Sequence, residues 1–281
     1  MGSRSASSTM ALYFRKRKGC SFGLPVPIRS QTLKFRRPSI WSSPTLVLVR
    51  RTAVRVISSG SAKTEEEIEA SQQLRIKLTK GNTKKKVFFW NNRNARRKQS
   101  GTLIWWFKEW LDKVGHDKAM LLMHTDPKDP HGQDLPHLID KLKLHNGQVL
   151  LSTQKVSPKD LASIYRTADY TINISDAEGF GLATLESLSC GTPIIVNMTG
   201  GLQEQVTDGK NFFGFAIHPC SKTVIGSLQV PYIYEDRISQ RDFDKALTKA
   251  LKNPVKKYKQ MASQGQRHIL KNYNFENFEN A

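Results

Sequence analysis

Two glutamates eight positions apart, Glu178 and Glu186, enclose a glycine-rich turn. The segment begins Glu178-Gly179-Phe180-Gly181, and a helix is expected to begin at Gly181. Glycine lets the backbone approach a ligand closely, and the free N–H groups at a helix N-terminus favour an anion such as a diphosphate. Glu186, about one and a half turns into the helix, can accept hydrogen bonds from hydroxyls such as those of a ribose. Glu178, on the loop, can reach a different part of the same ligand.

A basic loop over Asn91–Gly101 supplies the complementary charge. Arg93 and Lys98 stand five positions apart in it, together with Arg96 and Arg97. Cationic side chains that face a helix N-terminus can neutralise a leaving diphosphate and can replace a metal ion in that task. The alternative is a basic loop that contacts only solvent, and it applies more strongly to Arg96 and Arg97 than to the other two.

The elements around these residues alternate between strand and helix. Apolar runs predict five strands, and amphipathic patterns between and after them predict helices, with a loop-rich region following Asp208. The expected strands are Val87–Trp90, Ala119–His124, Gln148–Ser152, Tyr170–Ile174 and Pro193–Asn197. The expected helices are Glu65–Leu78, Thr102–Val114, Leu135–Leu144, Pro158–Ala168, Gly181–Cys190, Arg241–Leu251 and Val255–Asn272.

This alternation predicts an α/β fold, a Rossmann-like parallel sheet with helices on both faces. In open sheets of this kind, ligands bind outside the carboxyl ends of the strands, where the strand order reverses. Both the basic loop and the glycine-rich turn follow predicted strands. They are therefore expected to meet at one edge of the sheet.

The positive charge of the chain, formally +20, is concentrated near its N-terminus. Residues 1–64 carry 13 of the 44 Lys and Arg and no Asp or Glu, whereas residues 99–281 carry 21 basic and 20 acidic residues. A basic nucleic-acid-binding face on the body is therefore excluded, and the chain divides into a basic leader, 1–64, and a domain, 65–281. The leader is interpreted as an organellar targeting segment, a disordered arm that contacts polyanions, or an atypical start. Localisation is accordingly cytoplasmic or, with a transit peptide, organellar.

Other classes are excluded by composition and spacing. No apolar run reaches the roughly 18–20 residues that a membrane span needs, so no transmembrane segment is predicted. The three cysteines, Cys20, Cys190 and Cys220, lack the spacing of a disulfide scaffold or a cysteine zinc site. The histidines between positions 116 and 145 show no ligand spacing with an acidic partner, so no metal site is predicted. His124 and Asp126 remain candidates for ligand contact because they end a predicted strand.

The Glu178–Glu186 segment resembles the Glu-x7-Glu motif of retaining glycosyltransferases of family 4. In that family the motif belongs to the C-terminal, nucleotide-sugar-binding lobe of the two-lobe GT-B architecture. The resemblance covers about residues 65 to 281, with Phe212 standing where the family commonly has glycine. It extends through Ser187-Leu188-Ser189-Cys190-Gly191-Thr192-Pro193-Ile194-Ile195, Gly200-Gly201-Leu202-Gln203-Glu204 and Asp208-Gly209-Lys210-Asn211.

The resemblance implies transfer of a sugar from a nucleotide-diphosphate donor with retention at the anomeric carbon, without a cofactor or a metal ion. The catalytic residues that it implies are Glu178, at the hydroxyls of the transferred sugar, and Arg93 and Lys98, at the donor diphosphate. Catalysis would come mainly from stabilising the leaving diphosphate.

The resemblance also implies a set of donor-binding residues. Glu186 would bind the ribose hydroxyls, and the amides of Phe180, Gly181 and Leu182 would hold the sugar and the phosphate. Val156, in the loop 153–156, is the candidate for holding the base through backbone groups.

Family members carry an acceptor-binding lobe of about 150–200 residues before the donor lobe. Only about 64 residues stand there in this sequence. The first hypothesis is a donor half whose acceptor lobe comes from a second chain. The alternative is a non-catalytic subunit with a structural or regulatory role, or an incomplete transferase. No specific nucleic-acid partner is expected under either hypothesis.

Overall fold

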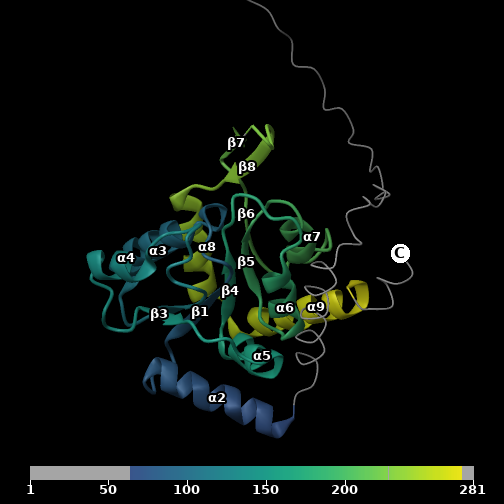
Figure 1. The fold of residues 1–281 in the computed structure, drawn as a ribbon. Helices are drawn as coiled ribbons and strands as arrows, with labels where there is room; N and C mark the ends of the chain where they lie inside the picture. The colour runs from purple at the N-terminus through teal and green to yellow at the C-terminus, as the bar shows by residue number, and fades with distance from the viewer. Residues whose placement is uncertain (1–63, 227, 274–281) are drawn as a thin grey trace, which may run out of the picture. The chain divides into compact units, whose positions relative to one another are not determined.

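Six parallel strands form the central sheet in the part of the chain that the computed structural model describes, residues 64–226 and 228–273. Their order is β3-β2-β1-β4-β5-β6, so the winding direction reverses between β1 and β4. This is the doubly wound, Rossmann-like arrangement, and the predicted fold class is confirmed (Figure 1). The strands are β1 (Lys86–Asn91), β2 (Ala119–His124), β3 (Val149–Ser152), β4 (Tyr170–Asn173), β5 (Ile194–Asn197) and β6 (Gly214–Ile217). The predicted basic leader lies outside the described residues, apart from Thr64.

The central strands are apolar on both sides because both faces of the sheet are covered. In β1, Phe88 and Trp90 point into one core and Val87 and Phe89 into another, and all four are fully buried. Alternate side chains of a strand point to opposite faces, so continuous apolar runs mark strands buried on both sides. This explains why these strands could be recognised from short apolar runs alone.

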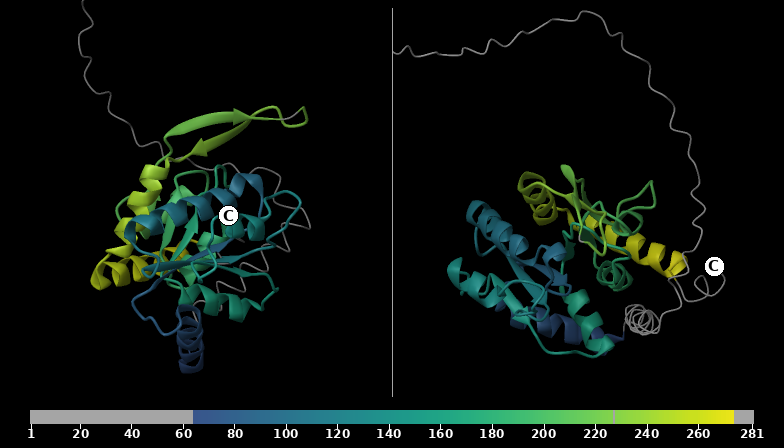
Figure 2. Two further views of the ribbon diagram at one scale, coloured as in Figure 1. Left: turned by 90° about the vertical axis from the view of Figure 1, so that its left-hand side faces the viewer. Right: turned by 45° about the horizontal axis from the view of Figure 1, so that its top comes forward.

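Helices cover the two faces of the sheet, as Figures 1 and 2 show. One face carries α3 (Ser100–Val114), α4 (Leu135–Lys141) and α8 (Gln240–Leu251). The other face carries α5 (Pro158–Thr167), α6 (Leu182–Ser189), α7 (Leu202–Val206) and α9 (Val255–Asn272). The predicted helix 135–144 ends earlier than expected, because Lys143 has a left-handed backbone (φ 55°). No helix within the described ranges is long and apolar enough to cross a membrane.

The first described helix, α2 (Glu65–Thr79), packs against α5 and is joined to the sheet by ion pairs. It begins after Thr64, whose side chain accepts a hydrogen bond from the Glu67 N–H at 3.3 Å. Its Arg75 forms an ion pair of 2.9 Å with Asp169, and Asp169 also pairs with Lys86 at the start of β1. These contacts anchor α2 at the amino ends of the strands.

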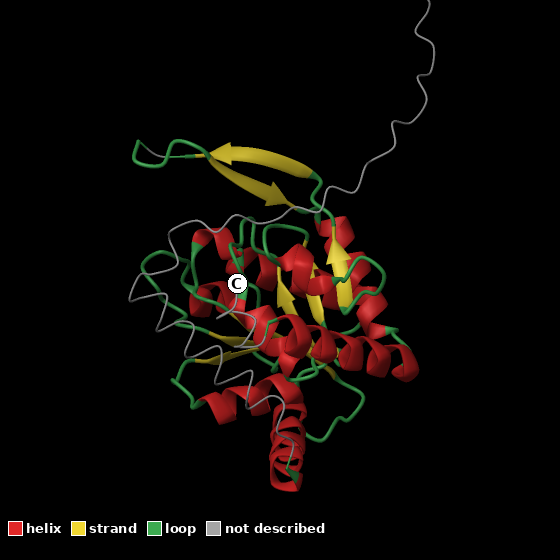
Figure 3. Ribbon diagram, turned by 90° about the vertical axis from the view of Figure 1, so that its right-hand side faces the viewer, coloured by secondary structure: helices red, strands yellow, loops and turns green. Residues whose placement is uncertain are grey.

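The region after Asp208 is not the loop-rich stretch that the sequence predicted. It contains β6, which completes the sheet beside β5, and an antiparallel hairpin of β7 (Ser221–Ile225) and β8 (Ile233–Arg237). β6 was missed because it has only four residues and begins with glycine. A Cβ at Gly214 would overlap the Ile194 carbonyl oxygen, so the close strand pairing there requires glycine. The hairpin stands off from the main sheet (Figure 3), and its half-exposed strands gave no core pattern.

Candidate active site

A cleft of about 480 Å³ opens at the carboxyl ends of β1 and β4, where the strand order reverses. This is the place where open α/β sheets bind ligands, and its volume is within the usual range for small-molecule sites. The loop after β1 forms one wall, and the loop after β4 with the first turn of α6 forms the other. The lining residues are Asn91, Asn92, Arg93, Arg97, Lys98, Glu178, Gly179, Phe180, Gly181, Leu182, Ala183 and Glu186.

The glycine-rich turn delivers the N-terminus of α6 to this cleft. Gly181 precedes the helix with a positive φ of 81°, which glycine adopts without strain. No side chain caps α6 at this end and no acidic residue lies in its first turn, so its first N–H groups are available to an anion. Gly200 and Gly201 pack against the backbone of this turn. The Gly201 N–H donates to the Gly179 carbonyl oxygen at 3.1 Å, and a Cβ at Gly200 would overlap the Glu178 carbonyl oxygen.

Glu186 lies at the base of the cleft, 6% exposed. One of its carboxylate oxygens accepts a hydrogen bond of 2.9 Å from the hydroxyl of Tyr165, a fully buried residue of α5. The Tyr165 oxygen in turn accepts one of 2.8 Å from the Asn91 side chain. Burial raises the pKa of Glu186 to about 7, and the Tyr165 hydrogen bond opposes that rise. Glu186 is thus a fixed carboxyl that ionises near pH 7, with one oxygen already accepting from Tyr165.

Lys98 and Glu178 form a buried ion pair across the cleft. Their side chains are 8% and 10% exposed. Burial lowers the pKa of Lys98, whereas the negative charge of Glu178 opposes the decrease. Arg97 approaches the same carboxylate at 3.8 Å and donates a hydrogen bond of 2.6 Å to the Ala177 carbonyl oxygen. The loop after β1 therefore contacts the loop after β4 through charge.

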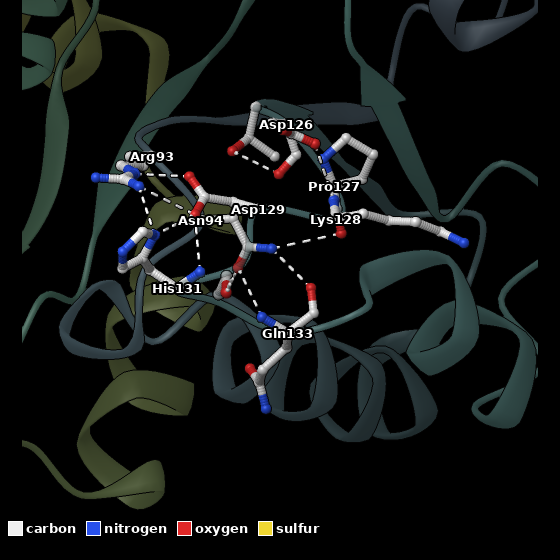
Figure 4. Close-up of polar contacts among 10 residues, drawn as sticks. Arg93, Asn94, Asp126, Pro127, Lys128, Asp129, His131 and Gln133 are labelled. Atoms are coloured by element: carbon white, nitrogen blue, oxygen red, sulfur yellow. Dashed lines mark hydrogen bonds and ion pairs between the residues drawn. The ribbon is translucent and has the colours of Figure 1, made fainter.

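Arg93, the other predicted cation, lines the cleft but binds a different carboxylate. Its Nε donates to Asp129 at 2.6 Å, and its Nη2 lies 2.7 Å from Nδ1 of His131 (Figure 4). Both partners lie on the loop after β2. The hydrogen bond to Asp129 raises the pKa of Arg93, which keeps the guanidinium charged.

Arg96 points out of the cleft toward the hairpin. Its guanidinium donates to both carboxylate oxygens of Glu235 in β8, at 2.6 and 3.3 Å. Arg237 donates to the same carboxylate at 2.9 Å. Because Glu235 is 1% exposed, this cluster ties the hairpin to the loop after β1. Arg96 therefore has a structural role, and the alternative that it contacts only solvent is wrong for this residue.

The cleft thus gathers seven of the predicted site residues, whereas Val156, His124 and Asp126 are not among its lining residues. Arg93, Lys98, Glu178, Phe180, Gly181, Leu182 and Glu186 line it. Val156 is half-buried in the segment between β3 and α5 and is not among the lining residues. His124, whose pKa is lowered by burial, contacts Ser152 at 2.9 Å and also lies outside the lining. Within the described residues, no group of three or more His, Cys, Asp or Glu side chains is arranged to hold a metal ion.

Sequence reasoning missed the residues that support the predicted ones. Tyr165 and Asn91 hold Glu186, and Asp129 and His131 hold Arg93. Tyr165 is indistinguishable from any core aromatic in an amphipathic helix. Asp129 stands 36 positions from Arg93, so only the adjacency of β1 and β2 in the sheet could have suggested the contact.

The chain is similar to known proteins in sequence and in fold. The family model described as glycosyl transferases group 1 matches residues 71–268. A D-inositol 3-phosphate glycosyltransferase of Paenarthrobacter aurescens is 36% identical over 77 residues, which are 27% of this chain and 18% of the relative. A second protein of that name, from Catenulispora acidiphila, is 33% identical over 97 residues, 34% of this chain and 23% of the relative.

Solved structures share the fold at low sequence identity. The HepE protein of Anabaena, solved with UDP-glucose, has a TM-score of 0.58 at 17% identity; the match covers 79% of this chain and 53% of that one. Sucrose-phosphate synthase from Thermosynechococcus elongatus has a TM-score of 0.56 at 21% identity, covering 74% and 45%. The chain therefore spans about half the length of these structures and less than a quarter of the two curated relatives.

Proposed function

The chain belongs to the glycosyl transferases of group 1, family 4, and on that premise we propose that residues 65–281 form a donor lobe that binds a nucleotide-activated sugar. One observation carries the proposal: two cations and two carboxylates from two segments far apart in the sequence converge on a single cleft at the N-terminus of α6. These residues are Arg93, Lys98, Glu178 and Glu186.

The donor diphosphate lies, in this proposal, between the N-terminus of α6 and the cations of the loop after β1. Lys98 and Arg93 neutralise the charge that develops on the leaving diphosphate when the bond to the anomeric carbon breaks. Fixed donors in a partly buried cleft stabilise such charge without reorganising during the reaction. The cations therefore do the work that a metal ion does in other phosphate chemistry.

In this proposal, the two glutamates bind opposite ends of the donor. Glu186 has one carboxylate oxygen bound by Tyr165, and the other accepts from the ribose hydroxyls. Glu178, which pairs with Lys98, accepts from hydroxyls of the transferred sugar. An acceptor hydroxyl oxygen then bonds to the anomeric carbon on the face from which the diphosphate leaves, and its proton passes to the departing diphosphate; the configuration is thereby retained.

The acceptor requires protein that the described residues do not supply. They form one lobe, and the structures that resemble it are about twice as long. We expect an acceptor-binding lobe, on a second chain or on a longer form of this one, to close over the cleft.

Calorimetric titration of the full chain with a panel of nucleoside diphosphates and nucleotide sugars tests the proposal. We expect saturable binding of one nucleotide, lost in Glu186→Ala and retained in Glu69→Ala, which removes an exposed carboxylate of α2. Absence of binding by a demonstrably folded protein would overturn the donor-lobe proposal and favour the non-catalytic alternative. Equal losses in the two variants would also overturn the assignment of Glu186.

A further inference from the structure

We propose that Asp129 is a positioning residue that presents the Arg93 guanidinium to the donor diphosphate, so that the loop after β2 is part of the donor site. The inference rests on the proposed function, because it takes Arg93 as a diphosphate ligand. The loop concerned, residues 125–134, is called the β2 loop below.

The contacts of Arg93 define which of its N–H groups remain for a ligand. Asp129 accepts from Nε at 2.6 Å and from Nη2 at 3.2 Å. Nδ1 of His131 lies 2.7 Å from Nη2 and 3.1 Å from Oδ1 of Asp129, so which of the two it pairs with depends on the imidazole tautomer. Nε and Nη2 are thereby engaged by the β2 loop. Figure 4 shows the remaining nitrogen, Nη1, pointing away from Asp129 without a partner among the residues drawn.

The β2 loop is itself held against the loop after β1, so Asp129 is a fixed acceptor. Asn94 is fully buried, and its side-chain amide donates to the Gln133 carbonyl oxygen at 2.7 Å. Its side-chain oxygen accepts from the Ser100 hydroxyl at 2.6 Å. The Arg96 N–H donates to the His131 carbonyl oxygen at 3.1 Å. The Asn94 amide also donates to the Pro127 carbonyl oxygen at 3.4 Å, so the two loops are joined by hydrogen bonds on both sides of Asp129.

Gly132 shows how closely the two loops approach. A Cβ at this position would overlap both the carbonyl oxygen and the side chain of Asn94. The β2 loop consequently cannot shift along the loop after β1 without losing its hydrogen bonds to the Asn94 side chain. The carboxylate of Asp129 accepts the His131 N–H at 2.9 Å as well, which fixes its own orientation.

A held arginine binds an anion better than a free one. The Arg93 side chain is 60% exposed, and without Asp129 it would sample many rotamers. Ordering such a side chain on binding costs affinity, and orienting it beforehand removes that cost. The negative charge of Asp129, whose side chain is 10% exposed, opposes an incoming diphosphate, but the positive charge of the Arg93 guanidinium with which it pairs compensates for it. We therefore expect positioning to outweigh repulsion.

A double-mutant cycle on the full chain tests the inference, with the nucleoside diphosphate that the wild type binds as the probe. Asp129→Ala is expected to weaken binding about 3- to 10-fold, the cost of immobilising one long side chain. In an Arg93→Ala background, the same substitution is expected to change binding less than 2-fold, because there is nothing left to position. Asp140→Ala, which removes an exposed carboxylate of α4, controls for net charge.

The outcomes separate this inference from the function on which it rests. If the wild type binds no nucleotide, both the proposed function and the inference are overturned. If the wild type binds but Asp129→Ala weakens binding equally in both backgrounds, Asp129 acts on loop folding and the inference alone is overturned. Tighter binding of the nucleotide by Asp129→Ala would mean that Asp129 competes with the diphosphate for Arg93, and this result would also overturn the inference. Equal unfolding midpoints of Asp129→Ala and wild type, together with the predicted cycle, would support it.

Discussion

Glu186→Gln is expected to stabilise the protein at alkaline pH, although it alters a proposed ligand-binding residue. Burial raises the pKa of Glu186 from 4.5 to about 7. A shift of one unit corresponds to about 1.36 kcal/mol, so about 2.5 units correspond to about 3 kcal/mol. This is the order of the free energy that the folded state forfeits when it must hold the ionised carboxylate. A glutamine keeps an oxygen that accepts from Tyr165 and carries no charge.

The sign follows from which state binds the proton. Below about pH 4.5 the carboxyl is neutral in both the folded and the unfolded chain, so Glu186 makes no difference. Between about pH 4.5 and 7 the unfolded chain ionises while the folded chain stays protonated, so the free energy of unfolding decreases as the pH rises. Above about pH 7 the carboxyl is ionised in both states, and the free energy of unfolding decreases no further on its account. The stabilising effect of Glu186→Gln therefore appears across this window.

Urea unfolding at pH 5 and pH 8 measures the effect. We expect Glu186→Gln to exceed the wild type by about 3 kcal/mol at pH 8 and by much less at pH 5. Glu69→Gln on the exposed side of α2 serves as the control and is expected to show no such pH dependence. A difference between Glu186→Gln and wild type that is the same at both pH values would refute the argument from burial.

Three further changes probe the supports of the cleft. Gly200→Ala should lower the free energy of unfolding more than Gly209→Ala in urea: both glycines have positive φ, but only Gly200 abuts the Glu178 carbonyl. Equal losses would contradict that packing argument. Lys98→Ala and Glu178→Ala should each lower the free energy of unfolding in urea by about 2 kcal/mol or more, because each leaves a buried charge without its partner. The double variant should lose less than the sum of the two single variants. Strictly additive losses would argue against an interaction between the two side chains. Asp169→Asn should speed hydrogen exchange of α2, whose arginine it binds; unchanged exchange would place the anchoring of α2 elsewhere.

Much of the fold and the converging site residues could be predicted because the relevant signals are local. Strands such as β1 are buried on both faces and therefore appear as apolar runs. Arg93 and Lys98 follow β1, and Glu178 follows β4. In a parallel sheet such positions lie at one edge, whatever the order of the strands. Chain direction therefore places these residues at the same edge, and they meet because β1 and β4 are neighbours in the sheet.

What could not be predicted depends on distant partners or on weak local patterns. β6 has four residues, and Phe215 and Ala216 within it are only half-buried. The bonds from Tyr165 to Glu186 and from Asp129 to Arg93 join residues of different elements. Neither residue type nor spacing signals such a bond, because buried tyrosines and loop aspartates are common. The order of the strands had to be known first.

The two cations predicted to share one task occupy different environments, and this difference bears on how a donor would bind. Lys98 is buried and pairs with Glu178, whereas Arg93 is exposed and pairs with Asp129. Each of these two cations is thus paired with a carboxylate before any ligand arrives, and Arg97 shares Glu178 with Lys98. In the proposed complex a diphosphate can approach Lys98 while Glu178 turns to the sugar hydroxyls, so the pair divides between two parts of one ligand. Arg93 keeps its carboxylate and offers only Nη1. Affinity would then come from the placement of donors rather than from excess positive charge in the cleft.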